Sequence, residues 1–309
     1  MNSNDILIVG TGALGTLFAA RLAQAGHRVT VLGTWKEGLS ALRENGARLI
    51  DAGGREHQFN VQVAEDPLEC AGAKHALLLV KSWQTERAAR QLYECLADDG
   101  LVVTLQNGLG NRERLVESLG SRRVALGTTT TGATLLGPGL ARAGGEGIIS
   151  IERHQALAPF EAALKSARFN VQIVEEAQSL IWGKLVINAA INPLTALLRV
   201  PNGELLNRPS AREMMGALAQ ETAQVAQAEN VRLPFADPVG AAEEVARKTA
   251  ANHSSMLQDV LRKAPTEIDA ICGGVVKTAQ RHEIDTPANR ACWHLVRALA
   301  VPDYQLQIA

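Results

Sequence analysis

The chain has 309 residues, of which 46% are hydrophobic and 20% are charged, a balance typical of a folded globular protein rather than a disordered or fibrous one. The formal net charge is −1 and no run of lysine and arginine forms a basic stripe, so a nucleic-acid partner is not expected. The length is enough for two domains with substantial cores.

The N-terminal stretch Met1-Asn2-Ser3-Asn4-Asp5 lacks the basic start and apolar core of a secretory signal. The longest apolar region, Leu180–Leu198, is interrupted by a lysine, two asparagines and a proline, which argues against a membrane span. The four cysteines form no CxxC pair and have no histidine at metal-ligand spacing. We therefore expect a cytoplasmic protein with reduced, mostly buried thiols, no membrane segment and no metal.

In chain order, the first half alternates between strand and helix patterns. Strands are expected at Ile6–Val9, Arg28–Leu32, Ala47–Asp51, Gln58–Val63, His75–Val80 and Leu101–Leu105. Helices are expected at Leu14–Ala25, Lys36–Asn45 and Trp83–Leu96. Such alternation is typical of a parallel sheet covered on both faces, with a hairpin at Gly53-Gly54.

The region Val124–Ile151 is rich in threonine and glycine and indicates an antiparallel addition at the sheet edge, followed by a helix at Ala156–Ala167 and a last strand at Val171–Val174. From about Ala177 the pattern is helical only. The expected helices are Ala177–Leu198, Ser210–Glu229, Asp237–Ala251, Met256–Arg262, Glu267–His282 and Pro287–Ala300.

These patterns predict an α/β Rossmann-like N-terminal domain over residues 1–175 and an all-α C-terminal domain over residues 176–309. The first is expected to bind a dinucleotide, and the second to carry substrate-binding and catalytic residues.

The loop after the first strand is a G-x-G-x-x-G sequence that opens a helix. Its glycines allow a tight turn, close approach of a pyrophosphate, and close packing of helix on strand. The N–H groups at the helix N-terminus favour an anion. The sequence therefore predicts a dinucleotide site that uses Gly10, Thr11, Gly12, Ala13, Leu14 and Gly15.

The second strand is followed by Gly33-Thr34-Trp35-Lys36, with no carboxylate before Glu37. An NAD-preferring site usually has an acid here for the ribose 2′-hydroxyl, so its absence, with Thr34 and Lys36 nearby, favours NADP(H). Lys36 as an ordinary solvated residue at a helix start stays an open alternative.

The helix at 177–198 is apolar on nearly all sides, yet Lys184, Asn188 and Asn192 are spaced at i, i+4 and i+8 and so share one narrow stripe. Buried amides and a buried ammonium need partners, so something polar is expected to face them. The alternative is a thin solvated strip on a surface helix. A second polar island holds Ser255 and Glu267, which taken alone read as a helix cap and a dipole-complementing acid near a helix start.

Taken together, these segments resemble the ketopantoate reductase (2-dehydropantoate 2-reductase) family over essentially the whole chain. The most specific matches are Trp182 to Asn188 with Ile191-Asn192-Pro193-Leu194-Thr195, and Ser255-Met256-Leu257-Gln258-Asp259 with Thr266-Glu267-Ile268-Asp269. Further matches are Gly10 to Gly15, Val80-Lys81-Ser82-Trp83-Gln84, Gln106-Asn107-Gly108, Gly127-Thr128-Thr129-Thr130 and Asn202-Gly203-Glu204-Leu205.

The resemblance implies NADPH-dependent reduction of ketopantoate to pantoate, a step in pantothenate and coenzyme A biosynthesis, in a cleft between a Rossmann-like and a helical domain. It implies that Lys184 is the general acid and that Glu267 orients it or binds substrate and cofactor. Asn107 would lie by the nicotinamide and substrate, and Lys81 near the cofactor. Asn188, Asn192 and Ser255 would hold the keto acid. The family often has an arginine directly after the second strand, where this chain has Gly33-Thr34.

Two rival functions stay open from the sequence. One is a related NAD(P)-dependent reductase of another small 2-keto acid, because a few pocket residues change the substrate on one scaffold. The other is a non-catalytic nucleotide-binding regulator, which would predict loss of Lys184, Asn188 or Glu267, all of which are present. A third possibility is that the helical domain serves mainly as a surface for homodimer formation, which is compatible with catalysis.

Overall fold

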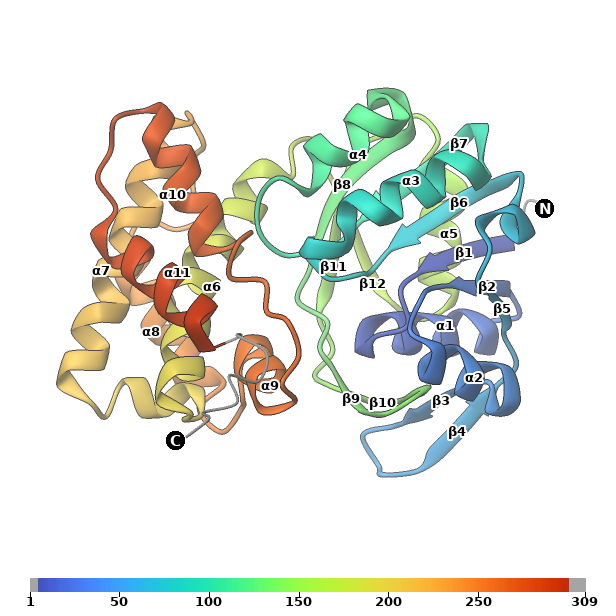
Figure 1. The fold of residues 1–309 in the computed structure, drawn as a ribbon, viewed down its shortest axis with the longest axis horizontal. Coiled ribbons are helices and arrows are strands. Elements are labelled where there is room, and N and C mark those ends of the chain that lie inside the picture. The colour runs from blue at the N-terminus through green and yellow to red at the C-terminus, as the bar shows by residue number, and fades with distance from the viewer. Residues whose placement is uncertain (1–4, 300–309) are drawn as a thin grey trace, which may run out of the picture. The chain divides into compact units, whose positions relative to one another are not determined.

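The computed structural model describes residues 5–299 and divides the chain into two units (Figure 1). The α/β unit comprises residues 1–106 and 111–177, and the helical unit comprises residues 107–110 and 178–309. The expectations for Met1 to Asn4 and for Ala300 lie outside the described residues.

The α/β unit is built on an eight-stranded sheet in the order β12-β11-β8-β7-β6-β1-β2-β5. The strands are β1 (Asp5–Val9), β2 (Arg28–Leu32), β5 (Gln62–Ala64), β6 (Ala73–Leu78), β7 (Leu96–Thr104), β8 (Val124–Thr129), β11 (Ile148–Glu152) and β12 (Asn170–Val174). All neighbours pair in parallel except β8 and β11, which are antiparallel. The predicted α/β fold class with a helical second part is confirmed.

The two faces of this sheet bury different residues because side chains alternate along a strand. In β1, Ile6 and Ile8 enter a core with α1 (Ala13–Gln24) and α5 (Ala158–Ser166). Leu7 and Val9 enter a second core with α3 (Thr85–Cys95) and α4 (Asn111–Leu119). The remaining helices of this unit are α2 (Lys36–Asn45) and the 3₁₀ turns η1 (Pro67–Cys70), η2 (Ser82–Gln84) and η3 (Ser121–Arg123).

A second, four-stranded sheet has the order β4-β3-β10-β9, with β3 (Ala47–Ile50), β4 (Glu56–Phe59), β9 (Ala133–Gly137) and β10 (Leu140–Ala143). The hairpin expected at Gly53-Gly54 is present as the antiparallel pair β3 and β4. The single strand expected at Gln58–Val63 was wrong: the chain leaves β4 at Phe59 and re-forms as β5, which pairs in parallel with β2 instead. The addition expected over Val124–Ile151 is likewise divided between the two sheets.

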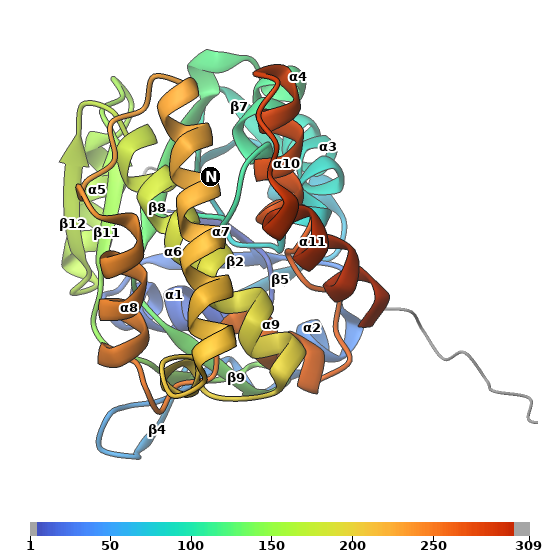
Figure 2. The same cartoon turned by 90° about the vertical axis from the view of Figure 1, so that its left-hand side faces the viewer.

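The helical unit contains α6 (Gln178–Leu198), η4 (Asn202–Leu205), α7 (Pro209–Ala228), α8 (Pro238–Lys248), α9 (Ser255–Leu261), α10 (Cys272–Arg281) and α11 (Pro287–Leu299) (Figure 2). Helix α6 packs against α7, α8, α9 and α11 and is the core element. It is long and apolar enough to cross a membrane, but 67% of its most apolar window is buried among these helices, as in the core helix of a globular unit.

The expected helix at Glu267–His282 begins later than predicted, at Cys272. Residues before it form turns, in which the Ala270 and Ile271 N–H groups donate to the Glu267 carbonyl at 3.0 Å. Glu267 is therefore held in a turn and does not lie in the first turn of a helix, so a helix-dipole role does not explain it.

Candidate active site

The glycine-rich loop begins at the end of β1. Gly10 has a φ of +127°, and its N–H donates to the Leu32 carbonyl at 2.9 Å. A Cβ on Gly15 would overlap with the carbonyl oxygen of Gly10, so the start of α1 reaches the strand only with glycine at this position. These two glycines set the tight turn that the sequence predicted.

Gly12 is the N-cap residue of α1 and provides no side-chain hydrogen bond to the helix. A Cβ placed on Gly12 would meet nothing within 4 Å, so the space beside this helix start is open. The first N–H groups of α1, which have no partner within a helix, point to this end. The loop from Gly10 to Gly15 therefore has room for a pyrophosphate, which the backbone N–H groups of Thr11, Gly12, Ala13 and Leu14 could hold.

Three loops meet at the carboxyl edge of the large sheet. They follow β1, β2 and β6, and β1 lies between the other two. The Leu79 N–H donates to the Val9 carbonyl at 2.9 Å, which joins the loop after β6 to the glycine loop. Lys81 is half-buried in this third loop. The chain continues from β1 to β2 on one side of β1 and later returns to add β6 on the other side. This edge is therefore a topological switch point, where α/β proteins bind nucleotides.

The loop after β2 has a fixed first residue. A Cβ on Gly33 would lie 2.8 Å from the Thr11 Cγ2 atom, so a side chain at this position would displace Thr11. Thr34 and Lys36 are exposed, and Trp35 packs its ring on Gly38 in the first turn of α2. Thr34 and Lys36 are thus brought to the same edge as the glycine loop.

In the helical unit, Lys184, Asn188 and Asn192 lie on one face of α6, as the spacing predicted. Asn192 is buried, and Lys184 and Asn188 are half-buried. Burial lowers the pKa of Lys184 from its ordinary 10.5 to about 8, and the nearby Glu267 carboxylate partly opposes this. A lysine with such a pKa gives and takes a proton readily near neutral pH.

Asn107 and Glu267, 160 residues apart in sequence, are hydrogen bonded: the Asn107 Nδ2 donates to the Glu267 Oε2 at 3.0 Å. Glu267 is only 5% exposed. The Leu109 N–H also donates to the Ala270 carbonyl at 2.9 Å, and Gly108, with a φ of +80°, would bring a Cβ within 2.5 Å of that carbonyl oxygen. Residues 107–110 are therefore bound to the helical unit, and Asn107, Glu267 and Lys184 form one cluster.

Ser255 is the first residue of α9 and is exposed. The N-cap is its neighbour Ser254, whose Oγ accepts from the Leu257 N–H at 3.1 Å. Ser255 is therefore not the cap, and its hydroxyl is left for another role. The sequence interpretation missed Ser254 and its buried partner Thr195, although Thr195 continues the polar stripe at i+3 from Asn192.

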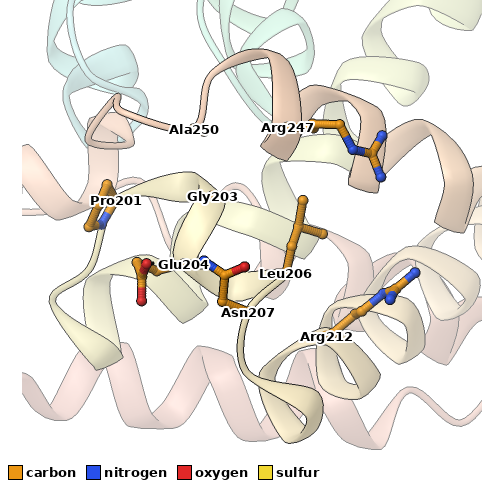
Figure 3. Close-up of a pocket in the computed structure, with 8 residues that line it drawn as sticks. All are labelled: Pro201, Gly203, Glu204, Leu206, Asn207, Arg212, Arg247 and Ala250. Atoms are coloured by element: carbon orange, nitrogen blue, oxygen red, sulfur yellow. Dashed lines mark hydrogen bonds between the residues drawn. The ribbon is translucent and has the colours of Figure 1, made fainter.

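A surface pocket of about 400 Å³ lies elsewhere in the helical unit, between η4 and the ends of α7 and α8 (Figure 3). Figure 3 shows Glu204 on one side and Arg212 and Arg247 on the other. Arg212 already makes two bonds to Glu243, at 2.6 and 2.8 Å, and Asn207 Nδ2 donates to Glu204 at 3.2 Å. The pocket contains none of the predicted site residues, and much of its polar lining is internally bonded.

The described residues 5–299 contain no group of three histidine, cysteine, aspartate or glutamate side chains arranged to hold a metal ion. All four cysteines are free and buried, and burial raises the pKa of each thiol. None is suited to act as a thiolate nucleophile.

A Rossmann-like unit with an open glycine loop, and a helical unit with a lysine of lowered pKa beside amides and a carboxylate, define the class of two-unit dinucleotide-dependent oxidoreductases. Residues 6–156 match the family model described as "Ketopantoate reductase PanE/ApbA", and residues 176–300 match its C-terminal model. The chain belongs to the ketopantoate reductase family, as the resemblance predicted.

Similar proteins cover nearly the whole chain. The 2-dehydropantoate 2-reductase of Halobacterium salinarum is 36% identical over 298 residues, covering 94% of this chain and 97% of the relative. That of Archaeoglobus fulgidus is 36% identical over 304 residues, covering 97% and 99%.

Among solved structures, a PanE/ApbA family ketopantoate reductase from Ralstonia eutropha is 32% identical with a TM-score of 0.89, covering 96% of this chain and 98% of the other. A D-mandelate dehydrogenase with bound NADH and anilino(oxo)acetate has a TM-score of 0.90 at 24% identity, with the same coverage. The latter likeness shows the fold alone.

Proposed function

We propose that this protein is a cytoplasmic 2-dehydropantoate 2-reductase, which reduces ketopantoate to pantoate with NADPH in the route to pantothenate and coenzyme A. The observation that carries the proposal is the cluster of half-buried Lys184 and Asn107 with buried Glu267, in which a proton donor of suitable pKa lies beside polar groups. The names of the relatives support the substrate.

Reduction of the keto group to a hydroxyl requires one hydride and one proton. When bound, NADPH would supply the hydride to C2 of the keto acid, and the C2 carbonyl oxygen would gain the charge. Lys184 Nζ, in its ammonium form, donates a proton to that oxygen and is left as a neutral amine, which regains a proton from solvent. Glu267 favours the charged form of Lys184 before each turnover.

The other polar residues hold the substrate. Ketopantoate carries a carboxylate and a hydroxyl besides its keto group, and these need hydrogen-bond donors and acceptors. Asn188 and Asn192 on α6 and Ser255 on α9 can supply amide N–H groups and a hydroxyl. Asn107, fixed by Glu267 and by the Leu109 bond, is proposed to contact nicotinamide and substrate.

A substrate panel tests the proposal against a reductase of another 2-keto acid. We expect kcat/KM for ketopantoate to exceed that for 2-ketoisovalerate, which has a hydrogen in place of the hydroxymethyl group, and that for benzoylformate by at least about 100-fold, because polar groups left unpaired in a site penalise an analogue strongly. Equal kcat/KM values would identify a reductase that accepts many 2-keto acids. A preference for benzoylformate would contradict the assignment of ketopantoate as the substrate.

NADPH is proposed as the cofactor because Gly33 leaves no room for a side chain at that position and the exposed residues that follow are Thr34 and Lys36. A hydroxyl and an ammonium suit a 2′-phosphate, whereas a ribose 2′-hydroxyl favours an acid. Lys81, Gly10 to Gly15, Asn107 and Glu267 are proposed to complete the cofactor contacts.

Replacing Lys36 with alanine is expected to raise the Kd for NADPH by about tenfold and leave that for NADH unchanged, because only NADPH offers the extra phosphate charge. Kd is measured by nicotinamide fluorescence, without turnover. Arg43→Ala is the control, since it removes a cation from the opposite end of α2. Equal changes for both cofactors would make Lys36 an ordinary solvated residue.

The substrate is a small acid, and no nucleic-acid or membrane partner is proposed. A homodimer through the helical unit stays a hypothesis, which sedimentation of the purified protein tests directly.

A further inference from the structure

We infer that Thr195 is a positioning residue, which sets the place of the Ser255 hydroxyl through a hydrogen bond to Ser254. The inference rests on the proposed function and adds residues to it. The Thr195 Oγ1 and Ser254 Oγ atoms are 2.6 Å apart. Thr195 is 0% and Ser254 is 6% exposed, so water does not compete freely for this bond.

The direction of the bond follows from the neighbouring acceptors. Thr195 Oγ1 lies 3.1 Å from the Ile191 carbonyl oxygen and 3.0 Å from that of Asn192, and a carbonyl only accepts, so the single Thr195 proton can be donated there. Either hydroxyl can donate in the bond between Thr195 and Ser254, and donation from Ser254 is the direction that leaves the Thr195 proton for these carbonyls. Ser254 Oγ also accepts from the Leu257 N–H, as the N-cap of α9. A directed chain thus runs from the start of α9 into α6.

The segment before Ser254 is also fixed. The Asn202 N–H donates to the Asn252 carbonyl at 3.0 Å, and the Gly203 N–H donates to the Ala250 carbonyl at 3.1 Å. The Asn202 Nδ2 donates to Thr249 Oγ1 at 2.8 Å. The Asn202-Gly203 pair therefore has a structural role, because its hydrogen bonds fix residues 249–252. Thr195 fixes Ser254, which follows this segment.

The result is a rigid frame for two proposed substrate contacts on different helices. Asn192 lies on α6, one turn before Thr195, and Ser255 follows Ser254 directly on α9. Without the Thr195 hydroxyl, the Ser254 donor is left unsatisfied in a buried position, and α9 must shift or rotate to satisfy it. Such a shift moves the Ser255 hydroxyl relative to Asn192. Binding of the keto acid is then weakened, whereas the glycine loop is unchanged.

The experiment compares Thr195→Val, which keeps the shape and removes the hydroxyl, with Thr195→Ser, which keeps the hydroxyl. We expect Thr195→Val to raise KM for ketopantoate about tenfold, the equivalent of one buried hydrogen bond, with KM and Kd for NADPH unchanged. Thr195→Ser should stay within about twofold of wild type. A Thr195→Val variant with wild-type KM for ketopantoate, or with equal changes for both substrates, overturns the inference.

A double-mutant cycle with Ser254→Ala tests whether Thr195 acts through Ser254. If it does, KM for ketopantoate in the double variant equals that of Ser254→Ala, because the pair is already broken. A further tenfold rise in the double variant contradicts the inference. The double variant leaves no unsatisfied hydroxyl, so it stays informative if Thr195→Val alone folds poorly. No ketopantoate turnover by the wild-type protein would overturn the proposed function instead.

Discussion

Replacing Lys184 with methionine is expected to lower kcat for ketopantoate reduction by roughly 10²–10⁴-fold, the usual contribution of a positioned general acid. Methionine fills similar space without a proton to donate. KM for NADPH should change little, because Lys184 belongs to the helical unit and the glycine loop to the α/β unit. Steady-state rates at saturating substrate measure the effect.

The same variant should be more stable than wild type, because the lowered pKa of Lys184 records a cost of burying its charged form. The folded protein holds this proton less tightly than the unfolded chain does. The cost is therefore absent above the ordinary pKa of 10.5, grows as pH falls to about 8, and is fully present at lower pH. We expect the free energy of unfolding of the methionine variant, measured with urea at neutral pH, to exceed that of wild type by on the order of 2 kcal/mol.

Lys184→Arg separates charge from proton donation, because arginine keeps the charge and does not release a proton at cellular pH. Loss of kcat in both variants supports a proton donor. A wild-type kcat in the methionine variant would refute the assignment, and a wild-type kcat in the arginine variant alone would reduce Lys184 to an electrostatic role.

The second large effect concerns pH. In the wild type, kcat for reduction should fall as pH rises through about 8, because Lys184 then loses the proton it must donate. Glu267→Gln removes the carboxylate that favours the charged lysine, so the descending limb should move roughly one unit toward lower pH. At pH 8 such a move lowers the protonated fraction of Lys184 from about one half to about one tenth, so the variant should be roughly fivefold slower from this cause.

Glutamine is the suitable replacement because its Oε1 still accepts from Asn107 Nδ2, and so the local geometry is retained. Asp269→Asn is the matched control: it removes an exposed acid two residues away, one bonded to Trp293 Nε1 at 2.6 Å. A pH profile shifted upward, or one shifted equally by both variants, would contradict the role given to Glu267.

The fold was predictable from sequence to a large extent because its signals are local. The strand-helix alternation, the glycine loop and the helix-only second half each follow from periodicity and turn chemistry within short windows. The elements whose bounds were predicted wrongly depend on contacts with residues far away in the sequence. The break between β4 and β5 depends on β2 as a partner, and the late start of α10 depends on turns that bind the Asn107–Gly110 segment.

The site was predictable only in part, for the same reason. Lys184, Asn188 and Asn192 share a helix face, so spacing alone brought them together. Asn107 and Glu267 are 160 residues apart, and only the fold shows their bond. The sequence singled out neither Thr195 nor Ser254, and it placed the cap at Ser255, because only the fold shows the contact across 59 residues.

The most direct test of the central claim is a turnover experiment with the purified wild-type protein, NADPH and ketopantoate. Loss of reduced-nicotinamide absorbance and formation of pantoate are followed together. We expect both to proceed at the same rate and in equal amounts, and faster with NADPH than with NADH. NADPH that persists in the presence of ketopantoate, in protein that binds NADPH normally by fluorescence, would contradict it.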